Sequence, residues 1–242
     1  DEKYIYFICP YQGTMPIFRM NVANRKVEQV AGGQYDYDGL QFAGKDLLIT
    51  CRHSFLEPNE VYSFKVGKEP VKLSSVTDPI MNTLGDVKCE KMMIPTTDGK
   101  MMTTWVLLPP NFDPNKKYPT VVYVYGGPHA HNVDARWHWS SRSWETYMAQ
   151  KGYLLFIIDN RGSEHRGKEF EQATFRQLGQ VEMQDQMTGV EYLKSLPYVD
   201  ADRIGVPARF CAAKSLSKAG KCTVCAHRLL HTKYRTLADL QK

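Results

Sequence analysis

Two short runs that are apolar throughout constrain the fold of this chain more than any other feature of its sequence. Residues 120–125 read Thr-Val-Val-Tyr-Val-Tyr, and residues 153–158 read Tyr-Leu-Leu-Phe-Ile-Ile. A strand without alternating polar positions needs cover on both faces, as in a parallel sheet packed between helices. No apolar run in the sequence approaches the roughly 18 residues that a membrane-spanning helix requires. We therefore predict a buried parallel sheet and no membrane segment.

The segments that follow these runs complete the pattern of an α/β domain. Residues 141–150 and 169–196 are predicted to be helical, and residues 202–206 are predicted to form another strand. One face of the second helix carries apolar side chains at helical spacing, which we expect in the core: Met183, Met187, Val190 and Leu193. Strand, helix, strand, helix and strand in this order favour a mostly parallel sheet.

A predicted hairpin precedes the first apolar run. Residues 87–94 and 101–108 both read as strands, and Thr97-Asp98-Gly99-Lys100 lies between them. The Asp-Gly pair favours a tight turn with positive φ, so the two strands are expected to pair antiparallel.

The first 80 residues have a different texture, with short alternating strands separated by turns. The Lys and Cys of residues 3–9 recur in residues 45–51, displaced by 42 positions, and residues 17–22 are echoed by residues 61–66, displaced by 44. A period of about 40–45 residues with several short strands is typical of β-propeller blades. Cys9 is expected, like its counterpart in the second copy, to be a buried free thiol rather than half of a disulfide.

The last 36 residues differ from the rest in charge and in cysteine content. Residues 207–242 carry eight Lys or Arg and one acid, a local charge of +7, so the first 206 residues account for −2 of the net +5. No nucleic-acid-binding motif accompanies this charge, and we predict no nucleic-acid partner. Cys222 and Cys225 precede His227 and His231 too closely for a zinc finger, because a single residue separates Cys225 from His227. We expect neither a metal nor another cofactor.

Several motifs in the α/β part resemble the prolyl oligopeptidase family of serine peptidases. They are Tyr123-Val-Tyr125-Gly-Gly-Pro-His-Ala, Asp159-Asn-Arg-Gly-Ser163-x-x-Arg-Gly167, Phe170-Glu-Gln172, Arg176-x-Leu-Gly179 and the helical segment Glu182–Leu193. Within the family, they look most like bacterial dipeptidyl peptidase IV-like enzymes. The resemblance spans about residues 1–206 and is strongest over 94–206.

The resemblance implies a fold, a domain division and an activity. It predicts β-propeller blades followed by an incomplete α/β-hydrolase domain with a mostly parallel sheet. We expect the C-terminal blades of a propeller in residues 1–85, the first part of the peptidase domain in 86–206, and an unrelated or out-of-frame basic tail in 207–242. The implied activity removes dipeptides from peptides with a free N-terminus, in a periplasmic or extracellular protein. A homodimeric parent enzyme is a further expectation.

One candidate site residue comes from the resemblance and two from position. Acyl transfer needs donors for the developing oxyanion, and the family's tyrosine at the position of Tyr125 supplies its hydroxyl to it. Asp159 and Arg161 follow a strand end, where α/β sheets bind ligands, but a structural ion pair holding the loop is the simpler interpretation. His129 and His131 are interpreted as loop residues, since the family's catalytic histidine lies much later in the chain.

Two acids on the predicted second helix have a structural interpretation. Glu182 and Asp185 stand three positions apart, and we expect them on a solvated or capping face of that helix.

The sequence lacks a nucleophile elbow. In α/β-hydrolases the serine lies in G-x-S-x-G at a strand-to-helix turn, and the acid and the base follow it. No such motif occurs in the 242 residues, Ser163 lacks the second glycine, and Ser215 stands between Lys214 and Leu216. We therefore expect this chain to be inactive, with no catalytic Ser, Asp or His. A frameshift or fusion after Val206 is one hypothesis, and translating the other frames past that codon tests it.

Two alternatives remain open at the level of sequence. One is a relative of acylaminoacyl peptidases or esterases, which the 97–100 turn and the 126–129 loop would also suit. The other is a non-catalytic binding protein that uses propeller blades as its surface. We also expect poor solubility, because open sheet edges and uncovered apolar faces favour aggregation.

Overall fold

The computed structural model describes residues 3–44, 46–55, 57–75, 87–126, 130–137 and 143–206. The chain divides into two compact units. The first contains Asp1–Gly85 and also Val133–Trp144, and the second contains Asp86–Asn132 and Glu145–Lys242. The predicted tail of 207–242, with its Cys and His cluster and Ser215, lies outside the described residues, as does His129. The three-part domain division stays a prediction.

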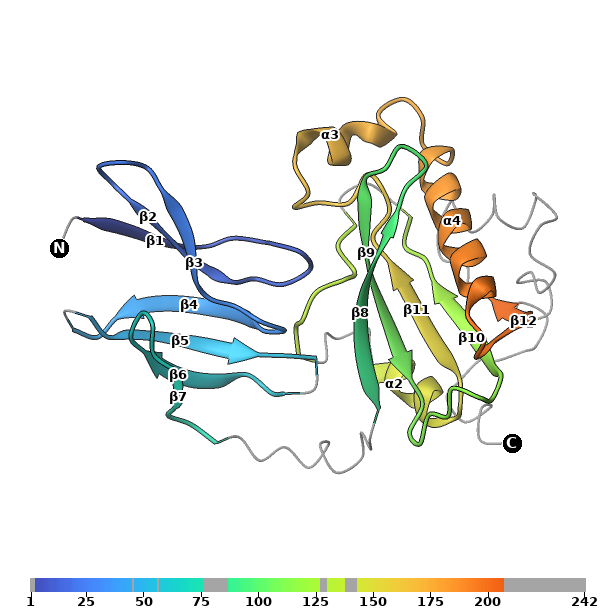
Figure 1. The fold of residues 1–242 in the computed structure, drawn as a ribbon, viewed down its shortest axis with the longest axis horizontal. Helices are drawn as coiled ribbons and strands as arrows, with labels where there is room; N and C mark the ends of the chain where they lie inside the picture. Colours follow the sequence, from blue (N-terminus) through green and yellow to red (C-terminus); the bar gives the residue numbers. More distant parts are fainter. Residues whose placement is uncertain are drawn as a thin grey trace. The chain divides into compact units, whose positions relative to one another are not determined.

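Antiparallel sheets make up the described part of the first unit (Figure 1). One sheet has the order β1-β2-β3, with strands Tyr4–Ile8, Ile17–Asn21 and Val27–Ala31. The other has the order β4-β5-β6-β7, with strands Asp36–Phe42, Leu48–His53, Glu60–Phe64 and Val71–Lys72. Each sheet is a simple meander, because every strand pairs with the next one in sequence.

The repeat seen in the sequence corresponds to equivalent strands of the two sheets. The displacements of 42 and 44 residues make β5 the counterpart of β1 and β6 the counterpart of β2. β1 and β2 form an antiparallel hairpin, and so do β5 and β6. The apolar side chains that point inward form one buried cluster, Ile17, Tyr37, Leu48 and Phe64. Cys9 and Cys51 are free thiols as predicted, but both are only partly buried.

A five-stranded mixed sheet forms the centre of the second unit, in the order β12-β10-β11-β9-β8. Its strands are β8 (Lys88–Pro95), β9 (Met101–Leu108), β10 (Tyr118–Tyr123), β11 (Leu154–Ile158) and β12 (Val199–Gly205). β10 pairs parallel with both β11 and β12, whereas β9 pairs antiparallel with β11 and β8. The predicted hairpin is confirmed, and Gly99 in its turn has a φ of 82°.

The buried parallel strands behave as their sequences predict. All five residues of β11 are buried, and Val121 and Val122 of β10 are buried with them. The apolar face of the long helix packs on this sheet, because Val190 and Leu193 belong to the same buried cluster as Phe156. Fully burying a side chain of this size stabilises the fold by roughly 1.5–3 kcal/mol.

Two helices connect the parallel strands, α2 (Ser143–Gln150) and α4 (Val181–Ser195). From β10 the chain crosses to β11 on one side and then returns past β10 to β12 on the other. Right-handed crossovers in opposite directions place the connecting helices on opposite faces, and Figure 1 shows α4 and α2 on either side of the sheet. The sheet is thereby covered on both faces, as its apolar strands require.

The prediction of a single helix over residues 169–196 is wrong. A short helix α3 (Lys168–Glu171) and a 3₁₀ turn η1 (Gln172–Thr174) end before α4 begins. Between them, Arg176 and Gly179 have φ values of 58° and 83°, which an α-helix cannot contain. The apolar periodicity therefore holds only from Val181 onward.

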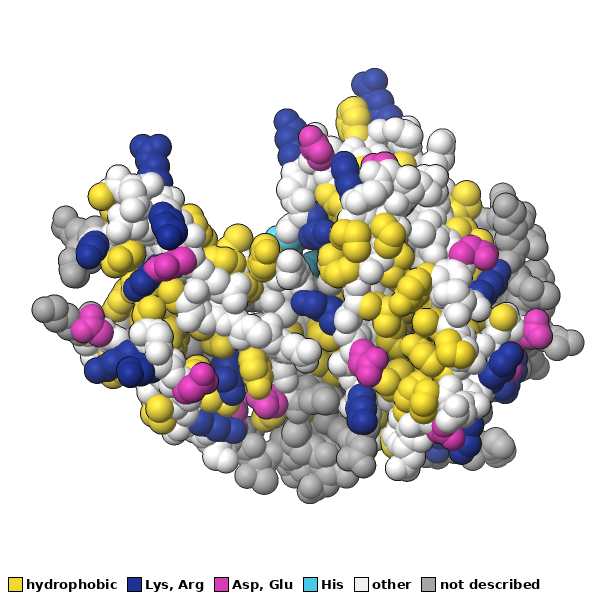
Figure 2. All heavy atoms as spheres, in the orientation of Figure 1, with side chains coloured by type: hydrophobic (Ala, Val, Ile, Leu, Met, Phe, Trp, Pro, Cys, Tyr) yellow, Lys and Arg dark blue, Asp and Glu magenta, His cyan; other side chains and the backbone are white. Residues whose placement is uncertain are grey.

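Some large apolar side chains remain on the surface of the described residues. Figure 2 shows hydrophobic side chains (yellow) on the visible face of the molecule. The more exposed ones in the first unit are Ile5, Tyr11, Val22, Val27, Phe42, Val71 and Leu73. Poor solubility stays a prediction.

Candidate functional site

The parallel pairing brings the ends of three strands to one edge of the sheet. Tyr125 follows β10, Asp159 follows β11 and Val206 follows β12, and β10 is the central strand of the three. The chain leaves β10 toward one neighbour and later returns to the other, so the edge beyond β10 is a topological switch point. Open α/β sheets bind their ligands at the carboxyl ends of strands at such a point. We take this edge as the candidate site.

Tyr125 lies at the centre of this edge and is half-buried. The strand holds its backbone, because Val124 continues β10 with a bridge and is buried. Gly126 follows with a φ of 64°, which turns the chain away from the strand direction. The tyrosine thus occupies the last position before the chain leaves the sheet, where a hydroxyl can face a ligand at the strand ends.

Asp159 contacts the backbone at Asn132, in the segment that follows Tyr125. Its Oδ1 accepts a hydrogen bond of 2.8 Å from the amide of Asn132, and its own amide donates to the carbonyl of Thr103 at 3.0 Å. The Nδ1 of His131 lies 3.7 Å from Asp159 Oδ2. The ring of His131 also meets that of His165 edge to face, with centroids 4.9 Å apart. His131 is therefore a loop residue, as predicted, but one that is held by a buried carboxylate.

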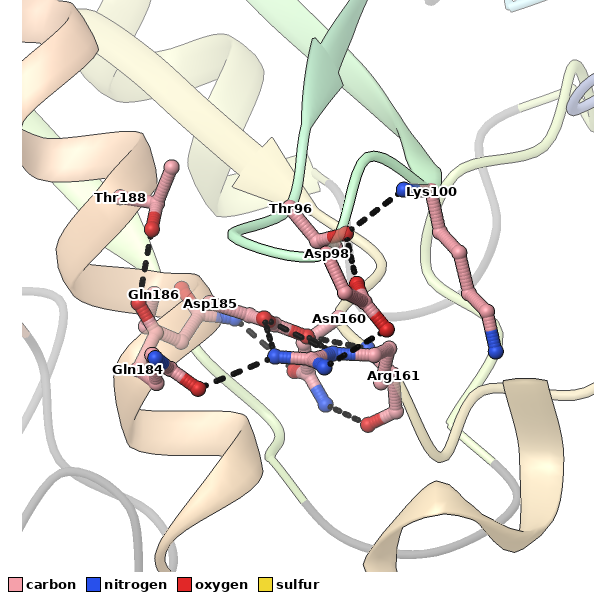
Figure 3. Close-up of polar contacts among 9 residues, drawn as sticks. All are labelled: Thr96, Asp98, Lys100, Asn160, Arg161, Gln184, Asp185, Gln186 and Thr188. Atoms are coloured by element: carbon pink, nitrogen blue, oxygen red, sulfur yellow. Dashed lines mark hydrogen bonds and ion pairs between the residues drawn. The ribbon is translucent and has the colours of Figure 1, made fainter. Parts of the chain in front are cut away.

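Arg161 has other partners, and it does not pair with Asp159. Its Nε lies 3.1 and 3.0 Å from the two carboxylate oxygens of Asp185, and its Nη2 lies 2.7 Å from Oδ1 (Figure 3). The backbone amide of Arg161 donates to Asp185 as well, at 2.8 Å. The side-chain hydrogen bonds that Arg161 donates to Asp185 are the largest reason that the pKa of Arg161 is raised. The guanidinium is permanently charged and fully engaged.

Two further side chains complete the ring around this guanidinium. Nη2 of Arg161 donates to Gln184 at 3.2 Å, and Nη1 lies 3.3 Å from Oδ2 of Asp98 in the β8–β9 turn (Figure 3). The pKa of Asp98 is lowered, first by the hydroxyl of Thr96 and then by the charge of Arg161. Arg161 thus ties the loop after β11 to α4 and to the hairpin turn. It braces the edge, because each of its three nitrogens has a carboxylate within 3.3 Å.

The interpretation of two helix acids as a solvated face is wrong. Asp185 is fully buried, and its pairing with Arg161 offsets the cost of burying its charge. Glu182 is 1% exposed. The capping part of the interpretation is correct for Glu182, whose Oε2 accepts from the amide of Gly179 at 2.9 Å. Sequence reasoning missed Asp185 because it lies far around the helix from Met183 and Met187, and only the structure places it on the buried face with Gly189 and Leu193.

Ser163 does not resemble a nucleophile in its surroundings. It is fully buried, and its hydroxyl donates to the carbonyl of Asn160 at 2.7 Å. Asn160 in turn donates to the carbonyl of Arg161 and accepts from Gln186 at 3.0 Å. Sequence reasoning did not single out Asn160 or Gln186, because neither residue type alone indicates a buried network. The hydroxyl serves to shape the loop.

Gly162 is required at this loop by its backbone and its surroundings. Its φ is 98°, and a Cβ at this position would lie 2.6 Å from Cγ2 of Thr174. Any side chain would be strained and would collide, so the close approach of the loop to η1 depends on glycine.

The described residues contain no group of three or more His, Cys, Asp or Glu side chains arranged to hold a metal ion. No helix within the described ranges has the length and apolar character to cross a membrane. The chemistry visible at the edge is that of hydrogen-bond donors and a braced loop.

Comparisons with known proteins agree with this architecture. Residues 139–207 match the model of the prolyl oligopeptidase family. The chain is 35% identical over 208 residues to dipeptidyl-peptidase 5 of Porphyromonas gingivalis, an alignment that covers 85% of this chain and 30% of that protein. The chain thus spans less than a third of the length of this relative. A dipeptidyl peptidase 4 of Trichophyton equinum is 34% identical over 161 residues, which are 63% of this chain and 21% of that protein.

Solved structures show the same likeness. A structure from Bacteroides ovatus, assigned as a dipeptidyl aminopeptidase IV, matches with a TM-score of 0.67 and 38% identity over 85% of this chain and 30% of that one. Dipeptidyl peptidase 4 of Porphyromonas gingivalis matches with a TM-score of 0.69 and 25% identity, covering 88% and 30%. The predicted fold class, propeller blades followed by part of an α/β-hydrolase domain, is confirmed. The chain belongs to the prolyl oligopeptidase family of serine peptidases.

Proposed function

We propose that this chain carries part of a dipeptidyl-peptidase-like serine exopeptidase, whose intact form cleaves N-terminal dipeptides through an acyl-enzyme. The observation that carries the proposal is the convergence of three parallel strand ends around β10, with Tyr125 two residues beyond the end of the central strand. The relatives with this sequence pattern are named as dipeptidyl peptidases. Their substrates, peptides with a free N-terminus, are the ones we assign to the intact parent.

The arrangement at the edge suits the needs of acyl transfer. When a nucleophile attacks a carbonyl, negative charge develops on its oxygen, and a fixed donor aimed at that oxygen lowers the barrier. We assign this donor to the hydroxyl of Tyr125. Asp159 contributes indirectly, because it holds the amide of Asn132 and so fixes the end of the loop that starts at Tyr125. Arg161 braces the neighbouring loop through Asp185. Both are positioning residues.

The nucleophile itself has no counterpart in the sequence. β12 ends at Gly205, and the segment after Val206 reads Pro-Ala-Arg-Phe-Cys without the small-residue elbow of α/β-hydrolases. We propose that the chain as given is inactive. A fluorophosphonate probe reacts with activated serines, so the intact mass of the purified chain is expected to show no adduct. An active serine peptidase treated in parallel is the positive control, and a stoichiometric adduct on this chain would refute the proposed loss.

The role of Tyr125 can be tested in a hybrid enzyme. Residues 87–206 would replace the matching segment of dipeptidyl-peptidase 5 of Porphyromonas gingivalis, which supplies the rest of the catalytic domain. We expect the hybrid to release dipeptides, and Tyr125→Phe to lower kcat by about 10²–10³ with little change in KM, because one oxyanion donor is lost. Tyr123→Phe, two positions earlier on the same strand, is the matched control with little expected effect.

Two results of this experiment would contradict the assignment. Equal effects of Tyr125→Phe and Tyr123→Phe would remove the special role of the Tyr125 hydroxyl. A folded hybrid that prefers acyl-blocked peptides to peptides with a free N-terminus would contradict the proposed exopeptidase class.

A further inference from the structure

The first unit contains three ionisable side chains that are almost completely buried next to one another. Asp36 on β4 is 1% exposed, His53 on β5 is 5% exposed, and the two face each other in the strand register. Asp134, also 1% exposed, belongs to the segment 133–136, which is part of the same compact unit. Buried charged groups are uncommon without a partner, so the pairing of each group decides what the cluster does.

Asp36 and His53 are poorly paired for buried polar groups. Oδ1 of Asp36 accepts from the amide of Met15 at 2.8 Å, but Oδ2 has no hydrogen-bond partner among the described residues. Neither ring nitrogen of His53 has one there either. Nε2 of His53 lies 4.0 Å from Asp36 Oδ2 and 3.9 Å from Asp38 Oδ2, too far for a hydrogen bond. An unmade hydrogen bond on an ionised buried carboxylate is costly, whereas the neutral acid tolerates it better.

The segment 133–136 reaches Asp36 with one carboxylate and one amide. The charge of Asp134 disfavours an ionised Asp36, while the nearby amide of Ala135 favours it less strongly. Asp134 is itself engaged by Arg136, whose backbone amide and Nε both lie 3.2 Å from its oxygens. Burial is the larger effect, and together with Asp134 it raises the pKa of Asp36 to about 7.

The remaining charges nearby do not neutralise Asp36. Asp38, two positions along β4, is 63% exposed at its side chain. Arg52 precedes His53 and points to the opposite face of β5, where its guanidinium stacks on Tyr35 and Tyr62. The ionised form of Asp36 therefore faces a carboxylate and an imidazole that makes no hydrogen bond among the described residues, and the charge of Arg136 opposes the effect of Asp134 less strongly.

We propose that Asp36 is a proton-dependent latch, whose neutral carboxyl holds the segment 133–136 against strand β4 and whose ionised form loosens that segment. The geometry supports this, because the segment places Asp134, itself 1% exposed, near Asp36, whose Oδ2 has no hydrogen-bond partner among the described residues. When the segment is attached, the neutral acid is favoured, so by linkage the neutral acid also favours attachment. The proposal does not rest on the proposed peptidase activity.

The direction with pH follows from the raised pKa. A free aspartate ionises near 3.8, so between about 4 and 7 the attached state binds a proton that the detached state lacks. Attachment is tight below this window and weakens as pH rises toward 7. Three pKa units correspond to roughly a thousandfold at most. Since the rest of the unit also buries Asp36, we expect about tenfold or more.

Hydrogen exchange of the intact chain tests the latch. A peptide covering 130–137 is followed by mass spectrometry at pH 5.5 and pH 8.0, and the rates are corrected for intrinsic exchange. We expect the corrected rate to rise about tenfold or more at the higher pH. Asp36→Asn, a neutral carboxyl mimic, is expected to make the rate independent of pH. Asp38→Asn removes an exposed acid from the same strand and is expected to keep the full dependence.

Other outcomes would overturn the proposal. They are a corrected rate that does not change with pH in the wild-type chain, or a dependence that survives in Asp36→Asn. Loss of the dependence in His53→Gln but not in Asp36→Asn would assign the titration to the imidazole instead. If Asp36→Asn does not fold, the side-chain ¹³C shift of Asp36 in the wild-type chain decides: a titration midpoint near 7 supports the latch, and a midpoint near 4 refutes it.

Discussion

Removing the carboxylate of Asp185 should destabilise the second unit more than any other single charge removal at the candidate site. Asp185 is fully buried and accepts hydrogen bonds from Nε, Nη2 and the backbone amide of Arg161. In Asp185→Ala, the buried guanidinium keeps Gln184 and one ion pair with Asp98. Breaking a buried pair by removing one partner costs about 3–5 kcal/mol, because a charge is left without compensation.

The remaining partners reduce this cost only slightly. The side chain of Asp98 is 47% exposed, and ion pairs with exposed partners contribute about 0–1 kcal/mol. We therefore expect a loss of about 3 kcal/mol in the free energy of unfolding, measured by urea denaturation with circular dichroism. Glu191→Ala is the matched control on the same helix, since its exposed pair with Lys194 should contribute less than about 1 kcal/mol.

A double replacement distinguishes a lost pair from lost packing. Arg161→Met combined with Asp185→Leu removes both charges, and replacing a buried pair by apolar side chains is often close to neutral. We expect the double variant to be more stable than Asp185→Ala alone. If Asp185→Ala costs no more than Glu191→Ala, Arg161 is not held as a buried charge, and the reasoning about the braced edge is refuted.

Two further predictions concern stability. Gly162→Ala should lower the free energy of unfolding, measured by urea denaturation, by about 1–3 kcal/mol or more, because it combines a positive φ with a Cβ placed 2.6 Å from Thr174. Gly152→Ala is the control, since Gly152 has a φ of 87° but no atom lies within 4 Å of its Cβ, and it should cost less. Equal losses in the two variants would contradict the collision. The pKa of Asp36 is raised from 3.8 to about 7, so the free energy of unfolding should fall between pH 4 and 7 by at most about 4 kcal/mol. Urea denaturation across this pH range should show a smaller fall in Asp36→Asn. Identical pH dependence in the two proteins would contradict the raised pKa.

Much of the fold follows from patterns that are local in the sequence. The apolar runs at 120–125 and 153–158 indicated buried parallel strands, and Asp98-Gly99 indicated the hairpin turn, because cover on both faces and positive φ leave direct marks on residue choice. The displaced copies in the first 80 residues indicated the repeated hairpins in the same way. Helix length was less well determined, since the predicted helix of 169–196 ran through Arg176 and Gly179, whose backbone has positive φ and breaks the helix.

The candidate site was predicted only in outline. Sequence position located Tyr125 and Asp159 at strand ends, because parallel strands share one edge. It could not assign the hydrogen-bond partners of Asp159 and Arg161. Asp159 accepts from the amide of Asn132, 27 residues earlier, and Arg161 donates to Asp185, 24 residues later. An acid on a predicted helix looks the same in sequence whether water or a guanidinium neutralises it, so Asp185 was expected on a solvated or capping face.

The sequence alone determined the class of fold, the family motifs and the absence of an elbow, since these depend on which residues occur and at what spacing. Only the tertiary structure decided which charges are buried together. Asp185 with Arg161 forms a satisfied pair, whereas Asp36 with Asp134 places two acids in a poorly hydrated cluster. The physical reason is that burial and pairing arise from contacts between residues far apart in the chain, and these set the energy of a charge far more than its neighbours in sequence do.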